Sequence, residues 1–287
     1  MSNKPVIFSP VGFLRLTRAW NLLIVVLTQL FTAYFLLIKP HEKLEFSFSI
    51  ILLSLGTVFI AAAGYVINDY YDVKIDYINK PGRVVVGKYM KRRAVMITHV
   101  ALNVIGLGIG LYLSLKIFVV FLLTAGLLWL YSNQLKRLPF VGNFSVALLT
   151  GLTVYIVALY IGDNNTQVLL FSYFAMGMTL IREIIKDIQD KEGDRSFGCK
   201  TLPVIWDIRS VKRLLYAIIV GFVLSVAFFT NPDISKMWYI FLTVFIVSQL
   251  GLGLMLYFAD QKKHYGRLSM YCKLLMVAGI LCMVFFN

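Results

Sequence analysis

Nine apolar segments, most of them about 20 residues long, dominate the sequence. They lie near residues 19–38, 46–67, 95–115, 117–131, 141–161, 166–182, 213–230, 237–258 and 268–286. The chain is 59% hydrophobic and 15% charged, and its mean hydropathy is +0.79, which is far from the average of soluble domains. A helix satisfies its own backbone hydrogen bonds in lipid, so we expect an all-α fold, a polytopic membrane bundle of nine transmembrane helices.

The N-terminal stretch does not have the pattern of a cleavable signal. Its basic residues run up to Arg18, and the apolar segment that follows is long enough to remain as the first span. No soluble domain of useful size is left outside the nine segments. We therefore expect one transmembrane domain over residues 1–287.

The basic residues predict the orientation of the chain. With nine spans, 23 of the 28 Lys and Arg residues fall on the side of the N-terminus. The positive-inside rule places that side in the cytoplasm, so we expect a protein of the cell (inner) membrane with its N-terminus inside and its C-terminus outside. Lys273 is the exception, because it lies inside the last apolar segment, where a lysine either reaches the membrane surface or meets a polar cavity.

Two aspartate triads share the spacing D-x-x-D-x-x-x-D: Asp69, Asp72 and Asp76, and, 118 positions further on, Asp187, Asp190 and Asp194. On a helix these positions fall within a sector of roughly 60°, so each triad presents three carboxylates on one face. With Glu183 and Glu192, eight of the 14 acidic residues lie in or beside the triads, although the formal net charge of the chain is +14. Both triads follow apolar segments on the cytoplasmic side, which predicts a concentrated negative site there.

The triads have the composition of a site for hard cations. Mg²⁺ prefers oxygen ligands and is typically bound by a few carboxylates together with the phosphates of a substrate. A diphosphate ligand would also explain the basic residues near the triads, which are Lys74, Lys80, Arg83, Lys136, Arg137, Arg182, Lys186, Lys191 and Arg195. Solvated ion pairs that cap helix ends are the simpler alternative for a single such cluster. Two triads with identical spacing favour a binding site.

Three polar segments resemble the motifs of the UbiA superfamily of intramembrane prenyltransferases. Residues 68–76, Asn-Asp-Tyr-Tyr-Asp-Val-Lys-Ile-Asp, are similar to its N-D-x-x-D-x-x-x-D motif, and residues 182–194 are similar to its second aspartate-rich motif. Residues 131–136, followed by Gly142 and Asn143, are similar to its third polar segment. The resemblance covers the whole chain. It implies a helical bundle with a central cavity that opens laterally to lipid, in which divalent cations bind an isoprenyl diphosphate.

The resemblance also implies roles for individual residues. Those implied to bind two or more Mg²⁺ ions, directly or through water, with Mn²⁺ as a substitute, are Asn68, Asp72, Asp187, Asp190 and Asp194. Asp69 joins this metal site or, like Asp76, orients the substrate. The residues implied to contact the diphosphate are Arg83, Tyr131, Lys136, Arg182 and Lys186, and those assigned to the catalytic step are Asp76, Tyr131 and Lys136.

The reaction implied is ionisation of an allylic C–O bond, release of diphosphate and attack by a lipophilic acceptor. Residues 182–194 with Lys200-Thr201-Leu202-Pro203 resemble the branch that prenylates geranylgeranylglyceryl phosphate. Residues 81–88 depart from that branch, which typically has R-P-x-x-S-G at this place, so an aromatic or quinone-precursor acceptor stays open. Membrane lipid is a further expected partner and nucleic acid is not. The sequence leaves the oligomeric state undetermined.

Two other classes of membrane protein use acidic residues. A CDP-alcohol phosphotransferase would have a D-G-x-x-A-R element, which the chain lacks, and its single site would not explain a second triad. A cation transporter would more naturally carry its acidic residues at mid-membrane depth. Glycines at Gly106, Gly108 and Gly110 resemble fragments of a nucleotide loop, but inside an apolar segment they favour close helix contact.

Overall fold

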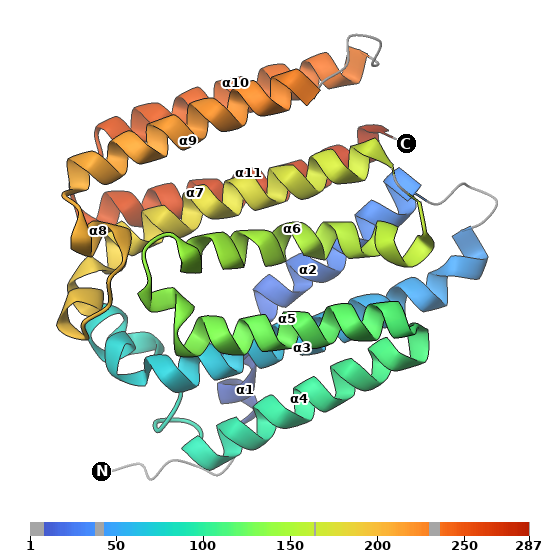
Figure 1. Cartoon of the computed structure of the whole chain (residues 1–287), viewed down its shortest axis with the longest axis horizontal. Coiled ribbons are helices and arrows are strands. Elements are labelled where there is room, and N and C mark those ends of the chain that lie inside the picture. The colour runs from blue at the N-terminus through green and yellow to red at the C-terminus, as the bar shows by residue number, and fades with distance from the viewer. Residues whose placement is uncertain (1–8, 38–42, 164, 230–235, 287) are drawn as a thin grey trace. The chain divides into compact units, whose positions relative to one another are not determined.

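The computed structural model describes residues 9–37, 43–163, 165–229 and 236–286. Within these ranges the chain is helical, and the only β-type pairing is an isolated bridge between Val86 and Met90. The long helices (Figure 1) are α2 (Ala19–Phe31) with its π-helical continuation η1 (Thr32–Leu37), α3 (Lys43–Asn79), α4 (Arg92–Leu113), α5 (Leu115–Asn133), α6 (Val141–Ile161), α7 (Thr166–Ser196), α9 (Ile208–Phe229), α10 (Lys236–Tyr257) and α11 (Lys262–Cys282). The short ones are α1 (Pro10–Leu16), η2 (Pro81–Arg83), η3 (Leu135–Arg137), α8 (Leu202–Ile205) and η4 (Met283–Phe286).

Nine of these helical segments, in the part of the chain that the structure describes, are long and apolar enough to cross a membrane. This confirms the predicted all-α fold and the predicted nine spans. Seven of them begin and end within six residues of the predicted limits. The predicted central cavity stays a prediction.

The second and sixth spans differ from the prediction, because their helices do not end at residues 67 and 182. Helix α3 has 37 residues and α7 has 31, and each runs without interruption through an aspartate triad. At about 1.5 Å per residue, α3 is roughly 55 Å long, well beyond the roughly 30 Å hydrocarbon core. The helices continue because loss of hydrophobicity alone does not stop a helix. Pro81 follows the end of α3, and Gly198, with φ +69°, follows the end of α7.

The chain divides into two compact units. Unit 1 comprises Met1–Leu30 and Lys39–Lys136, and unit 2 comprises Phe31–Ile38 and Arg137–Asn287. In unit 1, α3 packs against α4 and α5, which also pack against each other. A Cβ atom at Gly106 would lie 2.8 Å from Cδ1 of Ile60, and one at Gly110 would lie 2.8 Å from Cδ2 of Phe121. These two glycines therefore permit close helix contact, as predicted.

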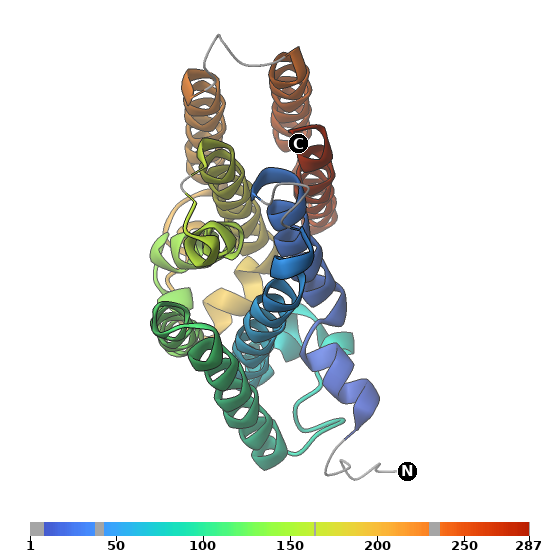
Figure 2. The same ribbon diagram turned by 90° about the vertical axis from the view of Figure 1, so that its right-hand side faces the viewer.

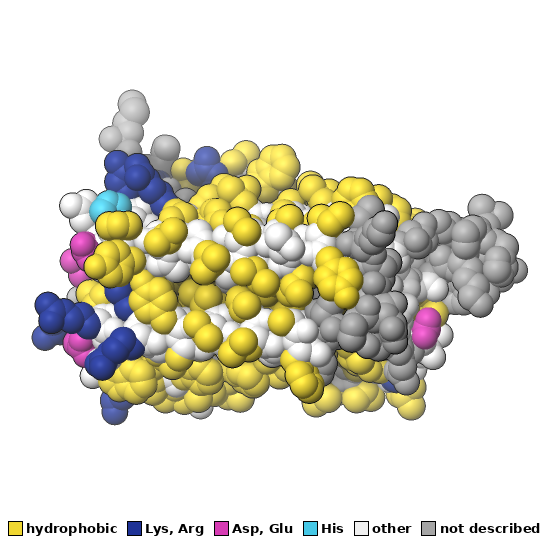
Figure 3. All heavy atoms as spheres, turned by 90° about the horizontal axis from the view of Figure 1, so that it is seen from above, with side chains coloured by type: hydrophobic (Ala, Val, Ile, Leu, Met, Phe, Trp, Pro, Cys, Tyr) yellow, Lys and Arg dark blue, Asp and Glu magenta, His cyan; other side chains and the backbone are white. Residues whose placement is uncertain are grey.

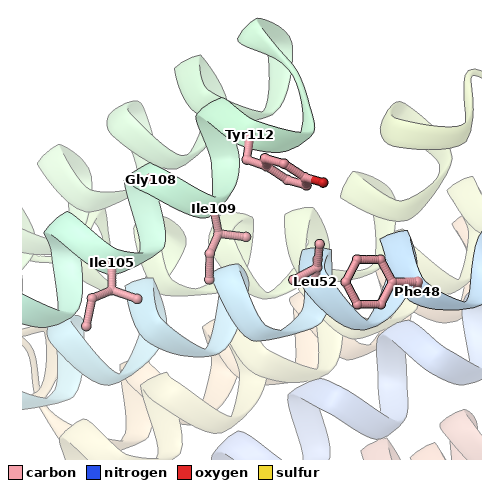
Figure 4. A pocket seen from close by; sticks show the side chains of 6 residues that line it. All are labelled: Phe48, Leu52, Ile105, Gly108, Ile109 and Tyr112. Carbon is pink, nitrogen blue, oxygen red and sulfur yellow. The ribbon is translucent and has the colours of Figure 1, made fainter.

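Gly108 differs from the two glycines beside it, because a Cβ atom there would meet nothing within 4 Å. It borders an open apolar pocket of about 440 Å³ between α3 and α4 (Figure 4). Phe48 and Leu52 line this pocket from α3, and Ile105, Ile109 and Tyr112 line it from α4. The pocket lies at the end of α3 that is far in sequence from the aspartate triad, so it does not contribute to the polar site.

In unit 2, α7 packs against α6, α9 and α11, and α10 packs against α9 and α11; Figure 2 views these helices nearly end-on. The rings of Phe174, Phe222 and Phe245 form a buried aromatic cluster, with centroid separations of 5.2–6.2 Å. The outer surface seen from above in Figure 3 is apolar, and basic side chains gather at one end of it. An apolar belt with charges at its end is the surface expected of helices that cross a bilayer.

Candidate functional site

The first triad provides a set of oxygen atoms that converge on one positive charge. Asn68 and Asp72 lie one turn apart on α3, and Nδ2 of Asn68 donates a hydrogen bond of 3.0 Å to Oδ2 of Asp72. The ammonium group of Lys136, from η3, lies 2.6 Å from Oδ1 of Asp72 and donates to Oδ1 of Asn68 at 3.3 Å. The side chains of Lys136 and Asp72 are only 11% and 16% exposed. An amide oxygen and a carboxylate oxygen therefore bind a single cation in a partly buried position.

Asp69 has a different partner, Arg18, which the sequence analysis did not connect with the triad. Nη2 of Arg18 lies 2.8 Å from Oδ1 of Asp69, and the guanidinium stacks over the ring of Tyr65 at 4.8 Å. Arg18 lies between α1 and α2 and has a left-handed backbone, with φ 53°, which is uncommon outside glycine. From this position between the two helices the Arg18 side chain reaches Asp69 on α3. No spacing rule predicts this contact, because 51 positions separate the two residues.

The other predicted residues of unit 1 lie near this cluster in sequence. Asp76 is half-buried on α3, one turn beyond Asp72, and Tyr131 is half-buried near the end of α5. The guanidinium of Arg92 stacks over the ring of Tyr70, inside the first motif, at 4.7 Å. The structure describes the backbone of Arg83 but not its side chain, so its predicted contact with diphosphate lies outside the described residues.

The second triad, in unit 2, is supported by polar residues from two other elements. Nδ2 of Asn143, at the start of α6, donates a 2.8 Å hydrogen bond to Oδ2 of Asp187. Thr201, just before α8, donates through Oγ1 to Oδ2 of Asp194 at 3.2 Å. Asp190 lies between these two aspartates on the same helix and is half-buried. Both donors occur in sequence segments that resembled family motifs, but only the folded chain pairs them with particular carboxylates.

Arg182 and Lys186 bind the carboxylate of Glu183. Nη1 of Arg182 donates to Oε1 at 2.7 Å, and Nζ of Lys186 donates to Oε2 at 2.8 Å. The Glu183 side chain is 9% exposed, so its charge is neutralised by two cations in a buried position. No sequence motif assigned a role to Glu183. Its spacing of four residues from Asp187 was the available signal, because it continues the acidic face of α7 by one turn.

The donor atoms fit a hard divalent cation, since they are carboxylate and amide oxygens. Lys136 occupies the point at which the oxygens of Asn68 and Asp72 converge, and a metal ion would use the same atoms. Among the described residues, no group of three His, Cys, Asp or Glu side chains is close enough to hold a metal ion alone. A cation at either triad would therefore take further ligands from water or from a substrate.

The fold and the two carboxylate clusters define a membrane protein that presents acidic and basic side chains together at the ends of apolar helices. The sequence profile of the UbiA prenyltransferase family matches residues 13–278, which covers nearly the whole chain and both units. The chain belongs to this family. This confirms the resemblance drawn from the motifs and the predicted enzyme class.

Curated relatives support the same assignment. The chain is 32% identical over 232 residues to a protein of Methanosphaera stadtmanae named digeranylgeranylglyceryl phosphate synthase, covering 80% of this chain and 84% of the relative. It is 35% identical over 237 residues to the protein of the same name from Thermococcus gammatolerans, covering 82% of each.

Solved structures share the fold. A UbiA homologue from Archaeoglobus fulgidus, bound to GPP and Mg²⁺, superposes with a TM-score of 0.69 at 17% identity, over 95% of this chain and 99% of that one. A structure from a study of digeranylgeranylglyceryl phosphate synthase in membranes superposes with a TM-score of 0.69 at 22% identity, over 95% and 96% of the two chains. At sequence identities of 17% and 22%, these two superpositions establish the fold of this chain and no more.

We expect Arg18→Ala to lower both stability and prenyl transfer, because it leaves the mostly buried carboxylate of Asp69 without its guanidinium. A hydrogen bond to a charged group contributes about 1.5–3 kcal/mol, and the partial exposure of Arg18 puts the loss at the lower end. Turnover should also fall, because Asp69 belongs to the first triad; a tenfold fall would correspond to about 1.4 kcal/mol of lost transition-state stabilisation. The measurements are thermal unfolding in detergent and product formation.

Arg15→Ala is the matched control, because Arg15 is exposed on α1 and bonds Tyr89 only at 3.4 Å. A double mutant cycle with Asp69→Ala measures the coupling between the two side chains. Additive losses of stability in Arg18→Ala and Asp69→Ala would contradict the pairing.

Proposed function

We propose that this protein transfers an isoprenyl group from an isoprenyl diphosphate to a membrane-associated acceptor, with a glycerol-phosphate ether lipid as the leading acceptor. The observation that carries the proposal is the cluster of Asn68, Asp72 and Lys136, in which a carboxylate, an amide and an ammonium group lie within bonding distance. A metal–diphosphate substrate requires this combination, because the carboxylates bind the metal and the ammonium binds phosphate oxygens.

The two triads are proposed to serve one diphosphate. Support comes from their identical spacing. The A. fulgidus homologue bound to GPP and Mg²⁺ supports Mg²⁺ as the metal. We further propose that two or more ions bind and that Mn²⁺ can replace Mg²⁺. When bound, these ions supply positive charge that stabilises the diphosphate as it leaves. The match of one family profile to residues 13–278 supports a single functional domain over the chain.

In the proposed reaction the C1–O bond of the allylic diphosphate breaks, and its electron pair leaves with the diphosphate. Lys136, Tyr131 and Arg83 donate to the diphosphate oxygens, which stabilises the charge that develops there. The acceptor hydroxyl then forms a bond to C1 through its oxygen and loses its proton. Asp76, one turn beyond Asp72, is the group proposed to orient the substrate and to accept that proton. The apolar surroundings exclude water from the allylic cation.

The acceptor is inferred from two kinds of support. The relatives from M. stadtmanae and T. gammatolerans carry the name digeranylgeranylglyceryl phosphate synthase. In addition, Thr201, from the segment that resembles that branch, bonds the third aspartate of the second triad. An aromatic or quinone-precursor acceptor is the alternative, favoured by the departure of residues 81–88 from that branch.

The function is tested by offering purified protein Mg²⁺ and geranylgeranyl diphosphate with three acceptors in parallel. These are geranylgeranylglyceryl phosphate, 1,4-dihydroxy-2-naphthoate and 4-hydroxybenzoate, and the products are identified by mass. We expect diphosphate release and a prenylated glycerol phosphate. If only an aromatic acid were prenylated, the proposed glycerol-phosphate acceptor would be wrong. The absence of any prenylated product or diphosphate release would refute prenyl transfer.

Removing one carboxylate from either triad should nearly abolish activity. We expect Asp72→Ala and Asp190→Ala each to retain less than about a tenth of wild-type turnover at saturating Mg²⁺, a loss of at least about 1.4 kcal/mol of transition-state stabilisation. Chelation of the metal should stop the wild-type enzyme. Glu192→Ala is the matched control, because Glu192 is an exposed acid on α7 beside the second triad. Activity above a tenth in either aspartate variant would rule out a shared cation site.

We further propose that both triads face the cytoplasm, with the N-terminus inside and the C-terminus outside, in the cell (inner) membrane. The support is the excess of Lys and Arg on that side of the nine spans. In a variant without Cys199, Cys272 and Cys282, a single cysteine at Lys88 or at Lys191 should react only with reagents that reach the cytoplasmic face.

A cysteine at Asp163, an exposed residue after α6, serves as the control for the outer face of the membrane. It should react from outside intact cells. Labelling of Lys88→Cys and Lys191→Cys from outside would reverse the orientation. Labelling of these two sites from opposite faces would contradict a shared site.

A further inference from the structure

Lys273 is a charged residue within a membrane-spanning helix, and the proposed reaction assigns it no role. It lies in α11, 11 residues after the first residue of that helix, which is about 16 Å along the axis at 1.5 Å per residue. The residues that follow it in the span, 274–286, include no charged side chain. A lysine at such a position is costly and usually marks a functional site, where it meets a partner of opposite charge.

The packing of α11 against α7 determines which residue lies level with Lys273. Thr179 donates to Sδ of Met276 at 3.9 Å, and a Cβ atom at Gly266 would lie 3.1 Å from Nε2 of Gln189. Residue 179 therefore lies level with residue 276, and residue 189 with residue 266, so the two helices run antiparallel. At every level the residue number on α7 and the residue number on α11 sum to about 455. By this register Arg182 lies opposite Lys273.

Three basic side chains lie close together along these two helices. Arg182 and Lys186 both bind the carboxylate of Glu183, and the register brings Lys273 to the level of Arg182. Arg182 still has hydrogen-bonding capacity, because its Nε is buried and has no hydrogen-bond partner among the described residues. A buried donor without a partner costs free energy, so a ligand that accepts from it would be stabilised.

We propose that Arg182 and Lys273 bind the phosphate group of the acceptor, as a subsite separate from the donor diphosphate. This inference rests on the proposed function. A phosphate monoester carries up to two negative charges and several acceptor oxygens, which match one guanidinium and one ammonium. A hydroxybenzoate carries one negative charge, and an uncharged quinol precursor carries none. The pair therefore selects an isoprenylglycerol phosphate among lipophilic acceptors.

The position of the subsite along α7 separates it from the metal ligands. Arg182 lies five residues before Asp187, so its Cα is about 7.5 Å further into the membrane. This assigns Arg182 to the acceptor, whereas the sequence alone suggested the donor diphosphate. The glycerol hydroxyl that attacks is only a few bonds from the phosphate of the acceptor.

The test uses the full chain with Mg²⁺, geranylgeranyl diphosphate and two acceptors, geranylgeranylglyceryl phosphate and the dephosphorylated alcohol. We expect Lys273→Met to raise KM for the phosphorylated acceptor at least tenfold, while KM for the donor stays within twofold and turnover of the alcohol is unchanged. Lys273→Arg should restore most of the affinity. Arg267→Met is the matched control, because it removes one exposed charge from the same helix and should leave all three quantities unchanged.

Arg182→Lys tests the second member of the pair while it keeps a positive charge beside Glu183. It should raise KM for the phosphorylated acceptor alone, because an ammonium lacks the fork of donors. Equal changes in KM for both acceptors, a rise in KM for the donor, or no change in Lys273→Met would overturn the subsite.

A binding measurement separates failure of the subsite from failure of the proposed function. Thermal stabilisation of the protein by geranylgeranylglyceryl phosphate, without donor, should be strong in wild type and lost in Lys273→Met. That result supports the subsite even if no product forms. Equal stabilisation of wild type and variant would overturn the subsite. The subsite would also be overturned if phosphatidic acid or inorganic phosphate stabilised the protein as strongly as geranylgeranylglyceryl phosphate and this effect required Lys273. The site would then recognise a bilayer headgroup or a free anion.

Discussion

Carboxylates at the ends of apolar helices must be neutralised, and this constraint organises the polar part of the structure. Taking an ionised carboxylate out of water costs several kcal/mol unless a cation and hydrogen bonds compensate. Asp69 and Asp72 take their partners from distant parts of the sequence, Arg18 and Lys136, whereas Glu183 binds Arg182 and Lys186 of its own helix. These contacts tie α1–α2 and η3 to α3 in unit 1. Asn143 and Thr201 likewise tie the starts of α6 and α8 to α7 in unit 2.

Helical continuity gives the triads their geometry. Because α3 and α7 extend past their apolar segments, the spacing D-x-x-D-x-x-x-D is a helix spacing and not a loop motif. A rigid helix holds carboxylates more accurately than a loop, which suits a site whose remaining ligands arrive with the substrate. Each helix is also anchored in its unit by close packing. Gly106 of α4, for example, allows close approach to Ile60 of α3.

Hydropathy and spacing were sufficient to predict the all-α fold, the nine spans and the carboxylate faces, because these depend on local sequence. The ends of α3 and α7 were predicted about twelve to fourteen residues too early, since hydropathy marks where a helix leaves lipid and not where it stops. The contact of Arg18 with Asp69 could not be predicted, because it depends on a left-handed backbone at Arg18 and on packing between α1 and α3. Glu183 could have been predicted by the same spacing argument as the triads, because it lies four residues before Asp187 on the same helix.

The proposed acceptor subsite follows from the electrostatics of bringing two anions together. Two unit negative charges 7.5 Å apart repel by about 2 kcal/mol at an effective dielectric of 20, and a phosphate and a diphosphate each carry more than one charge. The cations near the first triad already serve the donor in the proposed reaction, so the acceptor needs its own. Arg182 and Lys273 supply them from helices that are packed side by side, without using the carboxylates of either triad. An enzyme that joins an anionic acceptor to an anionic donor has to divide its positive charge in this way.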